Sequence, residues 1–116
     1  MRIILIATLG LCLVSCSQNL DKMTDDEVFI ASCMDDSYMS KQSLKLFGPT
    51  NIEWCQCQLT VIKTTVSPET RQQIATLIRD GESPHFMNAA SIISQKADKE
   101  ADAAMKAWVP TCKPFR

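Results

Sequence analysis

The chain has 116 residues, and its 12 Lys and Arg residues nearly balance its 13 Asp and Glu residues, giving a formal net charge of −1 at pH 7. A net charge this close to zero argues against a nucleic-acid-binding protein and against a polybasic contact with a membrane. The length suits one small domain, and the presence of only 3 glycines beside frequent Ala, Gln, Met and Lys favours helices.

The N-terminus has the pattern of an export signal. Met1 and Arg2 form a short positive start, and an uncharged apolar run follows from Ile3 to Leu13. This run is much shorter than the roughly 20 residues that a membrane-spanning helix needs, and it matches the apolar region of a secretory signal. The sequence therefore predicts an exported protein.

Leu13-Val14-Ser15-Cys16 resembles the lipobox of bacterial lipoproteins. The resemblance implies cleavage before Cys16 and acylation of the Cys16 thiol and amine, and several acyl chains on one cysteine give a stable anchor. Ser17, rather than Asp, follows the cysteine, which by the sorting rule of these lipoproteins implies the periplasmic face of the outer membrane. The alternative, an ordinary secretory signal, needs a small-x-small cleavage site, and none is well placed.

These features predict a signal peptide at 1–15, a lipidated tether at 16–22 and a helical, disulfide-bonded domain at 23–116. Of the six cysteines, Cys12 leaves with the signal and Cys16 is acylated. The remaining even number in a small exported domain predicts a disulfide framework with three alternative connectivities. Its members are Cys33, Cys55, Cys57 and Cys112.

The fold class expected for the domain is an all-α bundle of about four helices with short loops. Thr24 and Glu27 have the spacing of a capping box, which starts a first helix that runs to about Ser40. A connection follows at 43–50, where Gly48-Pro49 breaks any helix. Three apolar residues of this connection are expected in the core: Leu44, Leu46 and Phe47.

Three further helices follow. Thr50 or Asn51 can cap a second helix, whose inner stripe is Ile52, Cys55, Leu59, Ile62 and Val66. Ser67-Pro68 starts the third helix, which ends at Gly81. The fourth helix is predicted from about Pro84 to about Trp108, where Pro110 stops it and a short tail fastened by Cys112 remains. Its inner face is Phe86, Ala90, Ile93, Ala97, Ala101 (or Ala104) and Trp108.

The Cys55-Gln56-Cys57 motif lies within the second predicted helix. A helix turns about 100° per residue, so Cys55 and Cys57 point roughly 200° apart and should bond to different elements. The preferred pairing is Cys33–Cys55 with Cys57–Cys112, because Cys33 and Cys55 both lie on apolar faces. The alternative pairing, Cys33–Cys57 with Cys55–Cys112, remains open.

The sequence carries few residues suited to catalytic, metal or redox chemistry. A reactive Cys-x-Cys needs an exposed thiolate, yet Cys33 and Cys112 supply bonding partners. His85 is the single histidine, expected at the surface or in a first turn, and the methionines are scattered, which argues against a metal site. The paired acids of the first helix, Asp25-Asp26 and Asp35-Asp36, suit a solvated face. The sequence therefore predicts no catalytic residue, no metal site and no cofactor.

A binding or structural role is what remains. The chain resembles small cysteine-tied helical lipoproteins of the outer membrane, and the resemblance implies a pilotin-like or chaperone-like accessory of an envelope assembly, with a protein partner and no nucleic acid. More loosely, it resembles short exported Cys…Cys-x-Cys…Cys helical proteins. The alternative is a periplasmic protein that handles thiols or metals through Cys55 and Cys57. Trp54 lies off the inner stripe, on either a second packing face or a partner surface.

Overall fold

The computed structural model describes residues 20–35, 41–48 and 50–115, and every regular element in these ranges is helical. In chain order the elements are η1 (Leu20–Lys22), α2 (Asp25–Met34), α3 (Lys41–Phe47), α4 (Ile52–Thr65), α5 (Pro68–Arg79), α6 (Phe86–Ile93), α7 (Gln95–Cys112) and η3 (Lys113–Phe115). The expected all-α fold is confirmed. Across the described ranges, each helix is too short or too polar to cross a membrane.

The predicted capping signals start the helices as expected. Thr24 and Glu27 exchange the two hydrogen bonds of a capping box at the start of α2. Asn51 caps α4 and Ser67 caps α5 through side-chain oxygens that accept backbone N–H groups. Gly81 follows α5 with φ of 75°, the left-handed conformation that glycine adopts without steric penalty. Local sequence therefore determines where these helices begin and where α5 ends.

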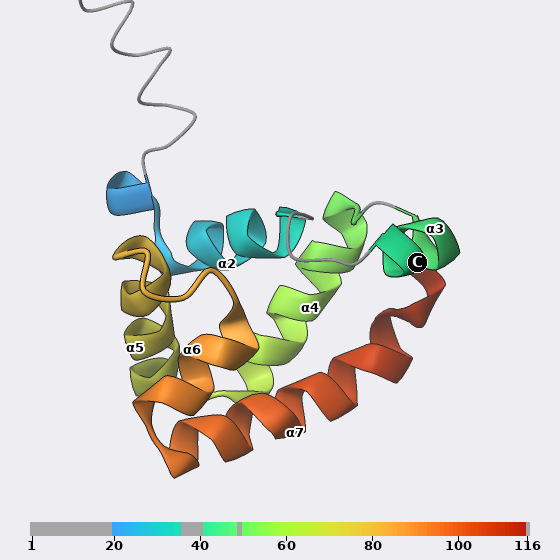
Figure 1. Cartoon of the computed structure of the whole chain (residues 1–116). Coiled ribbons are helices and arrows are strands. Elements are labelled where there is room, and N and C mark those ends of the chain that lie inside the picture. Colours follow the sequence, from blue (N-terminus) through green and yellow to red (C-terminus); the bar gives the residue numbers. More distant parts are fainter. Residues whose placement is uncertain (1–19, 36–40, 49, 116) are drawn as a thin grey trace, which may run out of the picture.

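Helix α4 lies between α2 and α7 (Figure 1). It packs against α7 on one side and α2 on the other, while α5 packs against α2 and α6, and α6 packs against α7. The core that these helices share is rich in small side chains, which allow close approach of α6 and α7 to their neighbours. Its buried members are Val28, Phe29, Ile62, Val66, Ile74, Ala75, Ile78, Ala89, Ala90, Ala97, Ala101, Ala104, Trp108 and Cys112.

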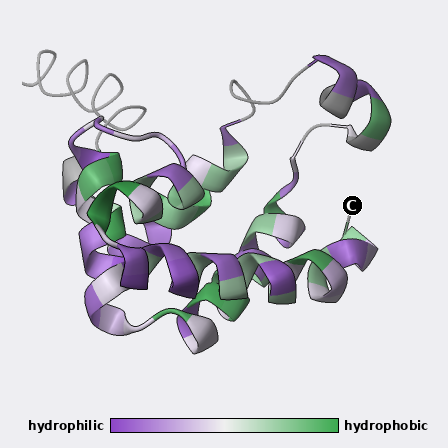
Figure 2. Cartoon of the chain, turned by 60° about the horizontal axis from the view of Figure 1, so that its bottom comes forward, coloured by the Kyte–Doolittle hydropathy of each residue, from purple (hydrophilic) through white to green (hydrophobic). Residues whose placement is uncertain are grey.

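The outward side of α7 is hydrophilic, as the charge run in its first half predicts (Figure 2). Glu100 is an exception. Its carboxylate turns toward α5 and accepts the Ser67 backbone N–H at 2.7 Å and the Thr70 hydroxyl at 3.3 Å. This carboxylate thus joins Ser67 in capping the start of α5, where a negative charge also complements the helix dipole.

One arginine holds the N-terminal turn against the bundle. The Arg79 guanidinium, at the end of α5, donates to the Met23 and Leu20 carbonyl oxygens at 2.7 and 3.3 Å. It also donates to the Asp25 carboxylate at 2.7 Å. Residues 20–22, expected as part of the tether, therefore form a turn that is fastened to the domain.

The prediction of one long fourth helix is wrong. The chain forms α6 and α7 instead, divided at Ser94, whose extended backbone has φ of −173°. The Ser94 hydroxyl accepts the Ala97 backbone N–H at 3.0 Å, so it caps α7. The start is also later than expected: His85 precedes α6, and the buried Ser83 hydroxyl donates to the His85 carbonyl oxygen.

Pro110 does not stop α7, which continues to Cys112. Proline removes one backbone hydrogen bond, but it lies in the last turn, where Cys112 is covalently held to α4. The short 3₁₀ turn η3 then completes the chain, and the Asn51 side chain donates to the Phe115 carbonyl oxygen at 2.6 Å. The tail is thus fastened by Cys112, as expected.

The region after α2 also differs from the prediction. Helix α2 ends at Met34, because Asp35 has an extended backbone, and the predicted extension to Ser40 lies outside the described residues. The expected connection contains helix α3, and Leu46 is exposed there rather than buried. The side chains of Leu44 and Phe47 also lie outside the described part of the chain.

Candidate functional site

Two disulfides join α4 to its neighbours. Cys33 of α2 bonds to Cys55, and Cys57 bonds to Cys112 of α7, with Cα atoms 5.7 Å apart in each case. The preferred pairing is confirmed and the alternative is wrong. Because Cys55 and Cys57 belong to different disulfides, they do not form the free dithiol that a Cys-x-Cys redox site requires. The proposed lipidation site, Cys16, lies outside the described residues.

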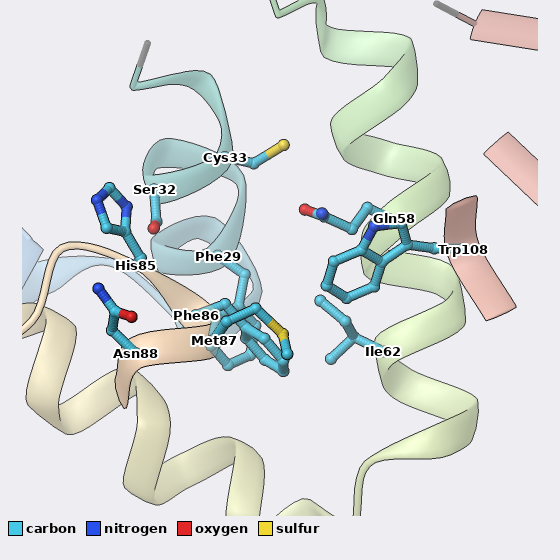
Figure 3. A pocket seen from close by; sticks show the side chains of 10 residues that line it. All are labelled: Phe29, Ser32, Cys33, Gln58, Ile62, His85, Phe86, Met87, Asn88 and Trp108. Carbon is cyan, nitrogen blue, oxygen red and sulfur yellow. The ribbon is translucent and has the colours of Figure 1, made fainter. Parts of the chain in front are cut away.

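A pocket of about 330 Å³ opens beside Cys33, between α2, α4, α7 and the start of α6 (Figure 3). This volume is at the lower end of the range found for ligand pockets, roughly 300–1,000 Å³. We call it the aromatic pocket. Its lining residues are Phe29, Ser32, Cys33, Gln58, Ile62, His85, Phe86, Met87, Asn88 and Trp108.

Three aromatic rings form the floor of the aromatic pocket. The Phe86 ring meets Phe29 edge to face, with centroids 5.5 Å apart, and meets Trp108 in the same manner at 6.0 Å. Each such pair adds about 0.5–1.5 kcal/mol beyond the burial of its area. Figure 3 shows Met87 and Ile62 converging on the same region. The floor is therefore apolar and fixed by its own ring contacts.

Polar side chains lie around this floor. Ser32, His85 and Asn88 gather on one side of the pocket and Gln58 on the other (Figure 3). The Ser32 hydroxyl donates to the Pro84 carbonyl oxygen at 2.6 Å, which holds the turn before α6 against α2. The Cys33–Cys55 disulfide holds α2 to α4. These two links keep the walls in place without a ligand.

None of the 10 residues that line the aromatic pocket is Asp, Glu, Lys or Arg. The carboxyl groups with lowered pKa values serve helix starts elsewhere. A hydrogen bond from the Thr24 backbone N–H lowers the pKa of Glu27, and one from the Ser67 backbone N–H lowers the pKa of Glu100. The pocket therefore favours an uncharged apolar group, because a charge buried there would lack a partner.

The acidic residues considered at the start of α2 have structural partners. Asp25 pairs with Arg79 at 2.7 Å, and Asp26 pairs with Lys63 at 2.8 Å. The first contact ties α2 to α5, and the second ties α2 to α4. Of the other acid pair, Asp36 lies outside the described residues. Within the described ranges, His, Cys, Asp and Glu side chains do not form a group of three or more that could hold a metal ion.

His85 and Trp54 are both half-buried. His85 lies immediately before the first residue of α6, outside its first turn, and also lines the aromatic pocket. Trp54 packs against the core, which decides in favour of a second packing face on α4.

The sequence pattern identifies the floor of the aromatic pocket but not its rim. Phe86 and Trp108 are predicted inward by helical periodicity, whereas Ser32, Gln58 and Asn88 carry no signal in the sequence. No family model matches the chain, and neither a curated protein nor a solved structure matches it.

Proposed function

We propose that the chain is an outer-membrane lipoprotein, anchored through acylated Cys16, whose domain faces the periplasm and binds a protein partner of an envelope assembly. In this role it is a non-catalytic accessory, similar to a pilotin or chaperone. The lipobox at Leu13 to Cys16 supports the anchor. The two disulfides are compatible with an exported domain, since such bonds persist in oxidising compartments.

The aromatic pocket is the observation that carries the binding role. It combines a preformed apolar floor with an uncharged polar rim, the usual composition of a small recognition site. One apolar side chain of a partner, such as Leu, Met or Phe, would fill part of it. Full burial of such a side chain contributes about 1.5–3 kcal/mol, and the amide and hydroxyl groups of the rim can bond the partner backbone.

The Cys33–Cys55 disulfide beside the aromatic pocket increases the affinity for a partner side chain that binds in the pocket. A wall that is already in place loses little conformational entropy when the partner binds. The Cys33–Cys55 bond and the Ser32–Pro84 hydrogen bond both restrict the separation of α2 from its neighbours. We therefore expect the partner to bind through a small number of well-placed side chains.

Cross-linking of intact envelopes, followed by mass spectrometry of co-purified proteins, tests the binding role. Gln58→Arg places a long charged side chain at the rim, while Gln56→Arg places the same side chain on the exposed side of α4. We expect the first variant to lose most of the co-purified partner and the second to retain it. Equal recovery with both variants would contradict binding through the aromatic pocket.

The anchor is tested separately by Cys16→Ser. This variant should remain uncleaved and unacylated, and membrane fractionation together with the mass of the N-terminal peptide would show both effects. Normal maturation of the variant would refute the lipoprotein assignment. Titration of free thiols in the native protein should detect none in the mature domain, whereas two or more reactive thiols would favour a thiol-handling function for Cys55 and Cys57.

A further inference from the structure

A second surface lies at the end of the molecule opposite η1. Four large apolar side chains are exposed there: Leu46 (69%), Ile52 (44%), Val109 (54%) and Phe115 (41%). They belong to α3, the start of α4, the end of α7 and η3. Figure 1 shows these segments at the opposite end from η1, and Figure 2 shows α3 and the C-terminus at the same end. Exposed apolar side chains that gather in one region can form an interaction site.

Covalent and hydrogen-bonded links hold the start of α4, the end of α7 and η3 together. The Asn51 side chain donates to the Phe115 carbonyl oxygen at 2.6 Å, and the Cys57–Cys112 disulfide ties the end of α7 to α4. Helix α3 is joined to α4 by residues 48–51, so it stays within roughly 18 Å of the start of α4. We call the resulting end of the molecule the distal surface, formed by Lys45, Leu46, Ile52, Val109, Lys113 and Phe115.

The distal surface is basic as well as apolar. Lys45 lies next to Leu46, and Lys113 lies one helical turn after Val109; both lysines are exposed. Glu53, beside Ile52, is the acidic residue that faces solvent there. Exposed acids instead lie at the ends of α2 and α5, at Asp35, Asp80 and Glu82. The distal surface therefore carries two exposed lysines beside one exposed acid.

We infer that the distal surface docks an acidic segment of a protein partner that also carries apolar side chains. Lysines around an apolar centre attract such a segment electrostatically, and the apolar side chains bury area once it has docked. The orientation of the domain relative to the membrane rests on the proposed function. A tether that enters at η1 holds that end of the domain near the membrane, so the distal surface faces away from the bilayer. A protein of the periplasmic space, rather than lipid, is then the occupant.

Photo-cross-linking in intact envelopes tests this surface. The photoreactive residue p-benzoylphenylalanine would replace Leu46 or Phe115, and Ile92 of α6, which is 61% exposed, is the matched control position. We expect the distal positions to attach to a peptide of another protein that is rich in Asp or Glu, and Ile92 not to do so. Attachment to lipid, to a second copy of this chain or to a peptide without acidic residues would overturn the inference, as would equal yield from Ile92.

Charge reversal provides the second measurement. Lys45→Glu with Lys113→Glu should lower the cross-linking yield about tenfold, because two attractive contacts become repulsive. Lys22→Glu with Lys99→Glu reverses two exposed lysines elsewhere and should leave the yield unchanged. Equal loss in both variants would contradict the inference. The mass at Cys16 tests the anchor independently: an unacylated chain that still attaches to the acidic peptide would refute the anchoring and support the distal surface.

Discussion

Removing the Cys57–Cys112 disulfide should destabilise the domain more than removing Cys33–Cys55. The two bonds close loops of different length, with sequence separations of 55 and 22 residues. In the chain-entropy model, cross-links of these spans restrict the unfolded chain by about 4.2 and about 3.4 kcal/mol. The loops do not overlap in the sequence, so we expect their contributions to add.

The burial of the cysteines does not change which disulfide should contribute more to stability. Cys55 and Cys112 are both fully buried, and each has a less buried partner, so replacement of either pair by alanine removes similar packing. Losing both bonds would remove about 7–8 kcal/mol, comparable with the whole stability of a small domain at about 5–15 kcal/mol. A chain with all four cysteines replaced should therefore be largely unfolded.

Urea unfolding followed by far-UV circular dichroism measures both effects. The Cys16→Ser chain serves as the reference, because it lacks the acylation site and keeps the domain intact. Cys57→Ala/Cys112→Ala should lower its free energy of unfolding by about 4 kcal/mol, and Cys33→Ala/Cys55→Ala by about 3 kcal/mol. A larger loss for the second pair, or losses below about 1 kcal/mol for both, would refute the unfolded-chain explanation.

Three further changes test the packing. Glu100→Gln should lower the free energy of unfolding by about 1 kcal/mol at neutral pH, because it weakens the bond from the Ser67 N–H. The pKa of folded Glu100 is lowered below 4.5, so its carboxylate stabilises the domain above that pH, and this stabilisation is lost as the pH falls through the lowered pKa. The difference in free energy of unfolding between wild type and Glu100→Gln should therefore shrink as the pH is lowered. A difference that stays constant with pH would contradict this reasoning. Arg79→Met should speed amide hydrogen exchange in residues 20–25 and leave α7 protected; unchanged exchange would show that the turn does not depend on Arg79. Trp108→Ala should cost about 3–5 kcal/mol in thermal or urea unfolding, because it removes the buried ring that contacts Phe86; a loss below about 1 kcal/mol would mean that the pocket floor repacks freely.

Helix α5 could be predicted because its signals are local, whereas the disulfide pairing could only be narrowed to two alternatives. Ser67-Pro68 sets the start of α5 by capping and by the backbone angle of proline, and Gly81 adopts the left-handed conformation after its end. Helical phase argues only against a Cys55–Cys57 bond, because two residues separated by one position diverge. The apolar faces that carry Cys33 and Cys55 favoured the observed pairing, but the sequence left the alternative pairing open. The bounds of α5 need no knowledge of how the helices pack, but the choice between the two disulfide pairings does.

The break at Ser94 and the exposure of Leu46 could not be obtained in the same way. Apolar periodicity continues through Ser94, and one serine within a helical pattern is common, so the pattern alone favours an unbroken helix. The extended backbone at Ser94 lets α6 and α7 pack against each other, which is a tertiary gain. The burial predicted for Leu46 is wrong because no local signal decides it. An apolar residue near a turn is buried only if a neighbouring element covers it, and α3 lies at the end of the molecule.

The positions of the two disulfides on α4 connect the stability of the domain with its surfaces. Cys55 and Cys57 are nearly neighbours in the sequence, yet their bonds support different regions. The bond to Cys33 holds the wall of the aromatic pocket, while the bond to Cys112 holds the end of α7, beside Lys113 and Phe115 of the distal surface. Because α4 carries both bonds, movement between the pocket and the part of the distal surface on α4, α7 and η3 has to deform α4 or its packing. We therefore expect a partner that contacts both the aromatic pocket and the distal surface to find them in one fixed relative arrangement. The Cys-x-Cys motif is the feature that we expect to fix this arrangement.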